Sequence, residues 1–261
     1  MSSEKNTPKI RFKGFTDPWE QRKLKELGDT YSGLTGKSKN DFGHGDAFYI
    51  PYLNIFTNSI VDNSNLEKID IDSKQHAVNY GDVLFTVSSE TPEDVGMTSI
   101  YMGNKNNVYL NSFCFGYRLN KHFDLFFLSS YFRSNVFRKS IEILAQGISR
   151  YNISKNKVMS LKIFIPTDDE QSNIGCLLNH LDDTITANQR KLDELKNVKK
   201  LLMQKIFSQE WRFKGFTDPW EQRKLGQIAR IQGGGTPDSK NKDYWDGDIN
   251  WFTPTEVGHS V

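Results

Sequence analysis

The most regular pattern of hydrophobic and polar positions in this chain lies in its second half. Beyond Thr167, apolar residues recur in alternating steps of four and three, the spacing of one narrow stripe along an α-helix. The stripe consists of Ile174, Leu178, Leu181, Ile185, Asn188, Leu192, Leu195, Lys199, Leu202 and Ile206, with Asn188 and Lys199 as its polar members. We therefore predict a continuous helix from about Asp168 to Ser208, roughly 60 Å long at 1.5 Å per residue.

The width of this stripe indicates what the helix packs against. A helix on a globular core has a broad apolar face, whereas a coiled-coil helix has a narrow seam. The seam stays narrow along the whole helix, so we expect residues 167–210 to pair with another long helix; an ordinary bundle helix is the alternative. Thr167 and Glu170 have the spacing of a capping box, which predicts where the helix begins.

A different pattern precedes the helix and predicts a mixed domain over residues 19–166. Residues 81–89 and 108–120 are rich in β-branched and aromatic side chains, which is typical of strands, and residues 161–166 predict a closing strand. Residues 124–145 have helical spacing. In the second strand, one predicted face holds Phe113, Phe115, Tyr117 and Leu119, opposite Cys114 and Arg118. The fold class is therefore α+β, with a long coiled-coil helix after a mixed α/β domain.

One segment of the chain occurs twice. RFKGFTDPWEQRKL occupies Arg11–Leu24 and returns unchanged as Arg212–Leu225. The likeness continues between GLTGKSKN, which begins at Gly33, and GGTPDSKN, which begins at Gly234, so a second copy of the first domain starts after the helix. We divide the chain into an opening segment at 1–18, a first domain at 19–166, the long helix at 167–210, and an incomplete second domain at 211–261.

Composition is that of a soluble globular chain. The 261 residues are 36% hydrophobic and 13% aromatic, which is enough to bury a core. The sequence has neither an apolar run long enough to span a membrane nor an apolar stretch in MSSEKNTPKI, so we expect a cytoplasmic protein. Cys114 and Cys176 are predicted to be small packed residues rather than a disulfide. The formal net charge of +2 gives no global signature of nucleic-acid binding.

Positive charge is nevertheless concentrated between Tyr131 and Lys162, where the single acid is Glu142. Within this stretch, QGISRYNIS combines a glycine turn with arginine, tyrosine and asparagine on one predicted loop. Arginine can bond guanine bidentately, asparagine can bond adenine, and serine and lysine suit phosphates. The predicted DNA-contacting residues are Arg133, Gly147, Ser149, Arg150, Tyr151, Asn152, Lys155 and Lys157. A solvated basic face is the alternative.

The sequence indicates no catalytic, cofactor or metal site. GLTGKS resembles the end of a phosphate-binding loop, but Tyr31 stands where that motif requires a glycine. In the second copy the Gly-Lys pair is replaced by Pro237 and Asp238, so the shared element is a turn. The five histidines lack metal-ligand spacing, and no Gly-x-Ser-x-Gly nucleophile motif is present.

The order of the motifs resembles a known protein family. The residues that carry the resemblance are Phe15, Asp17, Pro18, Trp19, Glu20, Leu24, Gly81, Asp82, Gly147, Arg150, Asn152, Ile165, Pro166, Glu170, Gln171, Ile174, Leu181, Asp182, Ile185, Asn188, Leu192, Leu195 and Leu202. Together with the internal repeat, they make essentially the whole chain similar to the specificity subunit of type I restriction–modification systems, truncated in its second half.

The resemblance implies two target-recognition domains, each recognising half of a bipartite site on double-stranded DNA, held apart by an antiparallel pair of long helices. It also implies partners: methyltransferase subunits that bind S-adenosylmethionine and modify adenine, and restriction subunits that hydrolyse ATP and cleave DNA. The chain itself is then expected to be non-catalytic and to bind no cofactor.

Two questions stay open at this point. The chain can be a DNA-binding specificity subunit, or a coiled-coil scaffold or regulatory partner of the methyltransferase subunit without DNA recognition of its own. In addition, the seam lacks a second long helix within the chain, which predicts an antiparallel homodimer through residues 167–210 with its dyad near Asn188.

Overall fold

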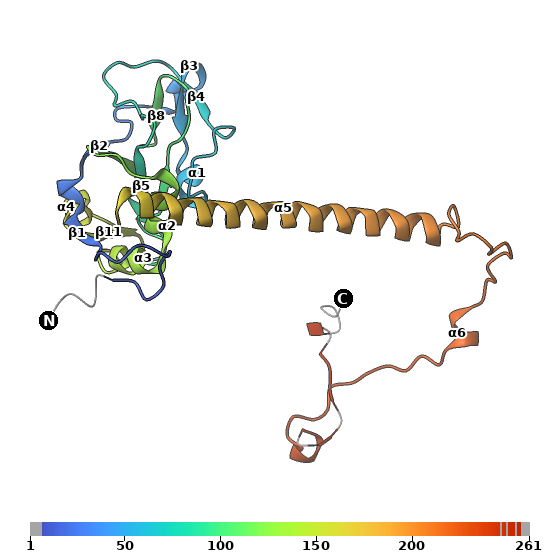
Figure 1. The fold of residues 1–261 in the computed structure, drawn as a ribbon. Helices are drawn as coiled ribbons and strands as arrows, with labels where there is room; N and C mark the ends of the chain where they lie inside the picture. The colour runs from blue at the N-terminus through green and yellow to red at the C-terminus, as the bar shows by residue number, and fades with distance from the viewer. Residues whose placement is uncertain (1–6, 246, 249, 254, 257–261) are drawn as a thin grey trace. The chain divides into compact units, whose positions relative to one another are not determined.

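A computed structural model of the chain describes residues 7–245, 247–248, 250–253 and 255–256 (Figure 1). The chain divides into two compact units, one up to Asn197 and one from Val198. The predicted segments 1–18 and 211–261 therefore reach beyond the described residues, and Val261, the predicted point of truncation, lies outside them.

The first unit is built around a central antiparallel sheet. Its strand order is β2–β9–β5–β7, formed by Gly28–Ser32, Cys114–Leu119, Val83–Thr86 and Thr98–Ile100. A second sheet has the order β4–β3–β8, formed by Glu67–Ile69, Phe42–Ile50 and Val108–Leu110, with β3 and β8 parallel. Two antiparallel pairs are β1 (Glu20–Lys23) with β11 (Lys162–Ile165), and β6 (Ser88–Ser89) with β10 (Tyr151–Asn152).

Strands β5 and β7 and the first four residues of β9 are buried on both faces, because each face of the sheet is covered there by other elements (Figure 1). The helical elements of the first unit that precede the long helix are η2 (Leu24–Glu26), η3 (Lys39–Asp41), α1 (Tyr52–Thr57), α2 (Leu125–Arg133), α3 (Asn135–Glu142) and α4 (Lys155–Met159). On one face, Phe85 and Phe115 pack with Phe132 of α2 and Phe137 of α3. On the other face, side chains of the β4–β3–β8 sheet and α1 form a second cluster that contains Ile50, Ile55, Leu84, Leu110 and Cys114.

The single helix predicted over residues 124–145 is two helices, α2 and α3. The chain leaves the helical conformation at Ser134, whose backbone is extended with φ −65° and ψ 150°. The Ser134 hydroxyl donates to the Tyr131 carbonyl at 2.7 Å and accepts from the Phe137 N–H at 3.4 Å. Serine thus ends α2 and caps α3, a local competition with the helix that apolar periodicity does not detect.

The strand predicted over residues 108–120 is also interrupted, between β8 and β9. The Asn111 side chain accepts from the Phe113 N–H at 2.9 Å and supports a turn, which leaves the Phe113 side chain 57% exposed. Phe113 therefore does not join the predicted face, whereas Phe115 and Tyr117 do and Leu119 packs against their cluster. The strand predicted at residues 161–166 is confirmed as β11.

The predicted long helix is confirmed as α5, Asp168–Phe207, with 40 residues. The predicted capping role of Glu170 is wrong, because both of its carboxylate oxygens accept from side chains far away in the sequence. Arg11 donates from Nε at 2.8 Å and from Nη2 at 2.6 Å, and Trp19 donates from Nε1 at 3.1 Å. Glu170 is 1% exposed, so this carboxylate holds the opening segment on the helix instead of capping it.

The first turns of α5 pack on the first unit and the rest of the helix is exposed. Ile174 packs against the main core cluster, and Gly175 lies so close to α2 that an added Cβ would stand 2.1 Å from Asp124 Oδ1. Beyond this point the seam faces solvent, with exposed side chains at Leu181, Ile185, Leu192, Leu195 and Leu202. The structure therefore leaves most of the predicted seam uncovered.

The second unit consists of the last turns of α5 and the repeated segment with the residues after it. Its elements in the described part of the chain are α6 (Leu225–Ile228) and η4 (Lys242–Tyr244). Trp220 packs edge-on against Phe207 with ring centres 6.3 Å apart. Large apolar side chains at Phe213, Phe216 and Leu225 stay exposed. Across the described residues, none of the helices is both long enough and apolar enough for a membrane span.

Candidate nucleic-acid interface

The predicted contact loop is closed by two reciprocal backbone hydrogen bonds. The Gln146 N–H donates to the Asn152 carbonyl at 3.0 Å, and the Asn152 N–H donates to the Gln146 carbonyl at 2.9 Å. Between them, Gly147 has φ +147°, and a Cβ there would stand 2.0 Å from the Arg150 carbonyl oxygen. Glycine at this position therefore allows the chain to turn back on itself within five residues.

The loop projects from a strand pairing at the edge of the first unit. β10 pairs with β6, and the next residue, Ile153, is buried in the main core and donates its N–H to the Val87 carbonyl at 3.0 Å. The Val87 N–H in turn donates to the Phe113 carbonyl at 2.9 Å. These bonds anchor the base of the loop while its tip, including Ile148, stays exposed.

Several candidate side chains share this surface. The Arg150 guanidinium lies 5.9 Å from the centre of the Phe113 ring, within range of a cation–π contact. Lys155, the first residue of α4, donates from Nζ to Ser32 Oγ at 3.0 Å. The loop thus holds Gly147, Ser149, Arg150, Tyr151 and Asn152, and Lys155 and Lys157 lie on α4, which follows the loop in the sequence.

Arg133 does not belong to this surface, because its guanidinium is used inside the domain. It donates to four backbone carbonyl oxygens, those of Ile55, Phe56, Asn58 and Thr98, at 2.7 to 3.0 Å. Burial, together with the nearby Arg138 cation, lowers the pKa of Arg133 to about 10. Arg133 is therefore a structural residue that connects α2 with the α1 region, and it is not a candidate for DNA contact.

Arg138 is occupied in the same way. It donates to the carbonyl oxygens of Glu93, Val95 and Gly96 at 2.5 to 2.7 Å. Burial also lowers the pKa of Arg138, against the opposing effect of Asp94 and Glu142. Two of the basic residues counted in the sequence therefore satisfy loop carbonyls, and the free positive charge of the region is smaller than composition indicates.

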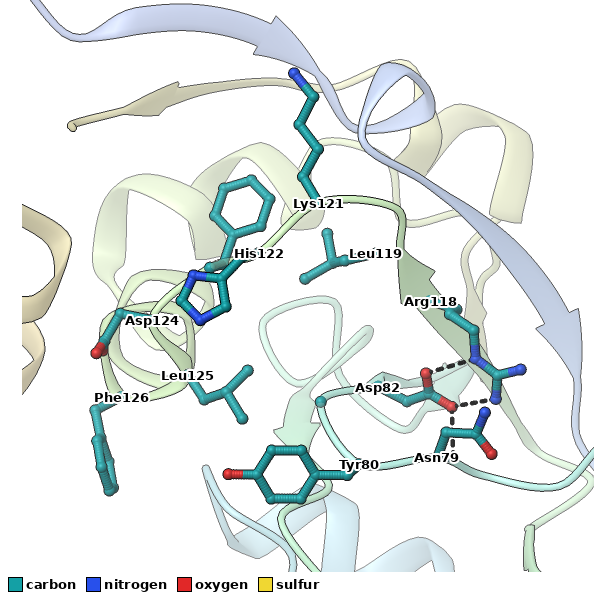
Figure 2. Close-up of a pocket in the computed structure, with 12 residues that line it drawn as sticks. Asn79, Tyr80, Asp82, Arg118, Leu119, Lys121, His122, Asp124, Leu125 and Phe126 are labelled. Carbon is teal, nitrogen blue, oxygen red and sulfur yellow. Dashed lines mark hydrogen bonds and ion pairs between the residues drawn. The ribbon is translucent and has the colours of Figure 1, made fainter. Parts of the chain in front are cut away.

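A buried network that sequence reasoning missed lies beside an open hollow of the first unit (Figure 2). Asp82 is 1% exposed and accepts from Arg118 Nε at 2.9 Å, from Arg118 Nη2 at 2.7 Å and from the Tyr31 hydroxyl at 2.7 Å. Burial and the adjacent Asp82 carboxylate raise the pKa of Tyr31 strongly. The signal in the sequence was Gly81-Asp82 at the start of a strand, where a carboxylate needs a specific partner.

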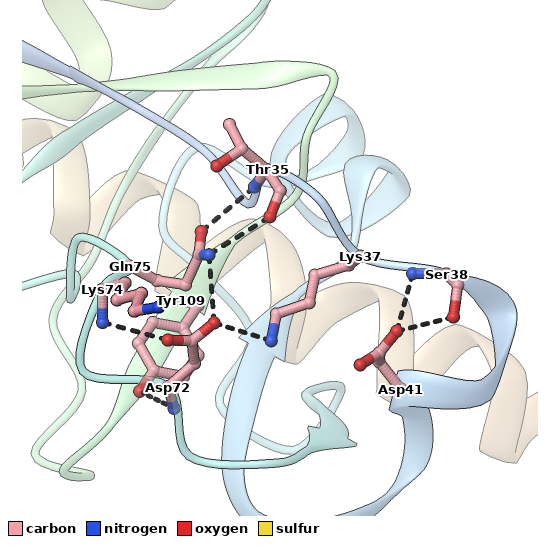
Figure 3. Close-up of polar contacts among 8 residues, drawn as sticks. All are labelled: Thr35, Lys37, Ser38, Asp41, Asp72, Lys74, Gln75 and Tyr109. Carbon is pink, nitrogen blue, oxygen red and sulfur yellow. Dashed lines mark hydrogen bonds and ion pairs between the residues drawn. The ribbon is translucent and has the colours of Figure 1, made fainter.

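The GLTGKS segment is a folded turn (Figure 3). Lys37 Nζ pairs with Asp72 at 2.8 Å, and Thr35 exchanges two hydrogen bonds with the Gln75 amide at 3.0 and 3.1 Å. The Ser38 hydroxyl and N–H both donate to Asp41 at 2.7 Å. The lysine that would contact a phosphate in a nucleotide site is therefore engaged by a carboxylate, in agreement with a structural turn.

The cysteines and acidic residues supply no further site in the part of the chain that the structure describes. Cys114 is buried as predicted, whereas Cys176 is exposed on α5, and both are free thiols. No group of three or more histidine, cysteine or carboxylate side chains gathers there in a way that could hold a metal ion.

Residues 16–197 match a family model described as "Type I restriction modification DNA specificity domain". This match covers the central sheet, the contact loop and most of α5. The chain belongs to this specificity-domain family. The family is defined by DNA specificity, which agrees with the prediction of a non-catalytic specificity subunit.

Individual relatives agree with the family match. The chain is 25% identical over 216 residues to the putative type I restriction enzyme MjaX specificity subunit of Methanocaldococcus jannaschii, covering 78% of this chain and 49% of that protein. The fold is similar to the S subunit of the M. genitalium type I system, with a TM-score of 0.51, 19% identity and coverage of 77% and 49%. It is also similar to the HsdS subunit of Thermoanaerobacter tengcongensis, with a TM-score of 0.50, 20% identity and coverage of 74% and 46%. The chain thus spans about half the length of these relatives.

Proposed function

We propose that this chain recognises double-stranded DNA as one half-site unit of a type I restriction–modification system. The observation that carries the proposal is the specificity-domain match over residues 16–197, which includes the loop closed by Gln146 and Asn152. The relatives are themselves described as specificity subunits. In this function the chain selects the DNA, and partner methyltransferase and restriction subunits supply the chemistry.

The exposed loop supports a division of tasks among its side chains. Arg150, with its planar fork of donors next to the Phe113 ring, is suited to contact a base edge. Lys157 is an exposed ammonium group without a hydrogen bond or ion-pair partner among the described residues, and it suits a phosphate. The loop itself is short and anchored, which limits the ordering cost on binding.

The proposal is tested by binding of fluorescent duplexes from a randomised library, selected on the full chain and then measured by anisotropy. Arg150→Ala is expected to lose about 1 to 3 kcal/mol on the selected sequence and to relax specificity at one position. Lys157→Ala is expected to weaken all duplexes alike and to reduce the salt slope by about one. Lys25→Ala, which removes an exposed charge outside the loop, serves as the matched control.

Two results would count against this assignment. If Arg150→Ala and Lys157→Ala bind as Lys25→Ala does at low and moderate salt, the loop is not the contact surface. If the intact chain selects no sequence and binds duplex DNA without salt dependence, the alternative of a scaffold or regulatory partner for the methyltransferase subunit replaces the proposal.

The exposed seam supports a proposal about assembly. Apolar side chains from Leu181 to Leu202 face solvent along α5, and two chains paired antiparallel would cover them. Such a homodimer would have its dyad near Asn188 and would present two identical recognition domains. Because two-fold protein symmetry is mirrored in the DNA site, the expected target is palindromic, with two inverted half-sites. Sequencing of the methylated sites in a host with and without this gene tests that expectation.

A further inference from the structure

A carboxylate follows the strand that pairs with the contact loop. β10 pairs with β6, and Tyr151 lies opposite Ser89 at the end of the pairing that points away from the core. The next residue outward is Arg150 on the β10 side and Glu90 on the β6 side. Opposed residues of an antiparallel pair have Cα atoms about 4.5 to 5.5 Å apart and side chains on the same face. Continued by one residue, this register sets Arg150 next to Glu90.

The β6 side of this arrangement is fixed, as the loop side is. Ser88 is 5% exposed, and its carbonyl oxygen accepts from the Tyr52 hydroxyl at 2.7 Å. The turn that follows Glu90 is held by Arg138, which donates to three of its backbone carbonyl oxygens. Glu90 therefore projects from a backbone that is anchored both before and after it, and little ordering is needed when it binds a ligand.

The side chains of Glu90 and Arg150 are both exposed and both available. Among the described residues, the Glu90 carboxylate accepts no hydrogen bond and pairs with no cation, whereas Asp94 in the same turn accepts from Thr91 Oγ1 at 2.8 Å. The Arg150 guanidinium likewise has no hydrogen bond or ion pair within that part of the chain, and it lies near the Phe113 ring. Neighbouring groups of opposite charge thus keep their donors and acceptors free.

A donor fork beside an acceptor is complementary to one base pair. In the major groove, guanine presents two adjacent acceptors, O6 and N7, and its partner cytosine presents the N4 amino donor. Arginine bonds the two guanine atoms bidentately, and a carboxylate accepts from cytosine N4. Adenine places a donor next to its acceptor, and thymine has one acceptor beside a methyl group, so neither offers the arginine fork two adjacent acceptors.

We propose that Arg150 and Glu90 together recognise a single G·C base pair in the major groove, with Arg150 on guanine and Glu90 on cytosine. This inference rests on the proposed recognition of DNA by the chain. Phosphates repel a carboxylate, so an acid on a DNA-contacting surface weakens binding to every duplex unless it accepts from a base. Glu90 therefore adds discrimination between sequences, whereas Lys157 adds general affinity.

Affinities for the selected duplex and for its single base-pair substitutions test the assignment. Glu90→Ala is expected to weaken binding to the selected duplex about tenfold and to relax the preference at one G·C pair. Arg150→Ala should relax the preference at that same pair. Glu93→Ala removes another exposed carboxylate from the same turn and is the matched control. It should tighten binding to all duplexes slightly, because it removes a charge that the phosphates repel.

Modified bases give a second measurement on the unaltered protein. 7-Deazaguanine lacks the N7 acceptor, and N4-methylcytosine keeps the hydrogen that pairs with guanine but carries a methyl group toward the major groove. Each base, placed in the recognised pair, should weaken binding several-fold. The 7-deazaguanine effect should be absent in Arg150→Ala, and the N4-methylcytosine effect should be absent in Glu90→Ala.

The outcomes separate this inference from the proposed function. If Glu90→Ala tightens binding to all duplexes as Glu93→Ala does, Glu90 is a solvated acid and the inference is wrong. Relaxation of different base pairs by Glu90→Ala and Arg150→Ala would also overturn it, although recognition of DNA by the chain would stand. An intact chain that selects no sequence would contradict the proposed function, and this inference with it.

Discussion

Buried charges in the first unit differ in what they stabilise. Glu170 is one half of an ion pair that joins the opening segment to α5, whereas Arg133 has no acidic partner and instead satisfies four backbone carbonyl oxygens. A substitution of Glu170 would leave the Arg11 cation without its counter-charge, and a substitution of Arg133 would remove its hydrogen bonds to these four carbonyl oxygens, so both changes are expected to be expensive.

Glu170→Gln is expected to lower the free energy of unfolding by roughly 3 kcal/mol, because it leaves the buried Arg11 cation without its counter-charge. Urea denaturation followed by circular dichroism measures the change. Glu20→Gln removes the carboxylate of an exposed pair with Arg22 and should cost less than about 1 kcal/mol. Equal losses of unfolding free energy from the two substitutions would contradict a larger contribution of the buried Arg11–Glu170 pair.

Arg133→Met is expected to destabilise the first unit by at least about 2 kcal/mol, since it leaves carbonyl oxygens near α1 without donors. DNA affinity per folded molecule should stay unchanged, because the guanidinium is not part of the exposed loop. Denaturation and anisotropy on the same preparation separate the two effects. A variant with normal stability and lost DNA binding would return Arg133 to the contact set.

At the scale of elements, the junction between α5 and α2 depends on Gly175. A Cβ at this position would meet Asp124 Oδ1 at 2.1 Å and the Phe127 nitrogen at 2.8 Å, and Asp124 is the residue that caps α2. Gly175→Ala should therefore destabilise the chain by about 1 to 3 kcal/mol, despite the gain of about 1 kcal/mol in helix propensity. Gly226→Ala, whose Cβ would meet open space, should leave the unfolding midpoint unchanged. Thermal denaturation of both variants checks this.

The elements could be predicted wherever one physical signal dominated. The long helix followed from its seam alone, and the strands β5 and β11 followed from their apolar runs. The break at Ser134 could not be predicted, because a serine hydroxyl bonds its own backbone equally well at the surface of a continuous helix. The role of Glu170 was missed because a capping box is local, whereas its partners Arg11 and Trp19 are distant in the sequence.

The candidate interface was predictable only in part, for a related reason. Residues 146–152 form a loop because Gly147 permits the turn, and that can be inferred from local sequence. Burial of a long side chain depends on the tertiary fold, so Arg133 could not be distinguished from Arg150 by composition. The Asp82–Arg118 pair joins the start of β5 to β9 and leaves no trace in the spacing of either segment.

At the scale of the whole molecule, the uncovered seam leads us to expect association. Light scattering at micromolar concentration should give a mass near twice the 30.1 kDa of one chain. Asn188→Leu should raise the melting temperature, since it replaces a polar residue in the proposed interface, and should loosen the choice of alignment between the helices. Lys191→Leu, outside the seam, is the control for a general gain in hydrophobicity. A monomeric mass would contradict the homodimer, and the seam would then be expected to pack against the methyltransferase subunit or another partner.

The burial of β5 and of most of β9 on both faces has a consequence for strand alignment. A strand with one solvent-exposed face is kept in register because a shift by one residue would expose its apolar side chains. Residues 83–86 of β5 and 114–117 of β9 are buried on both faces and lack that protection. Steric fit and charge supply the missing information. Gly116 lies opposite Tyr31, where a Cβ would stand 2.0 Å from the ring, and Asp82 pairs with Arg118 at a fixed offset. A shift of register would place a side chain against the Tyr31 ring, or it would leave the buried Asp82 carboxylate without Arg118. These few residues therefore specify the register, which the apolar pattern alone does not.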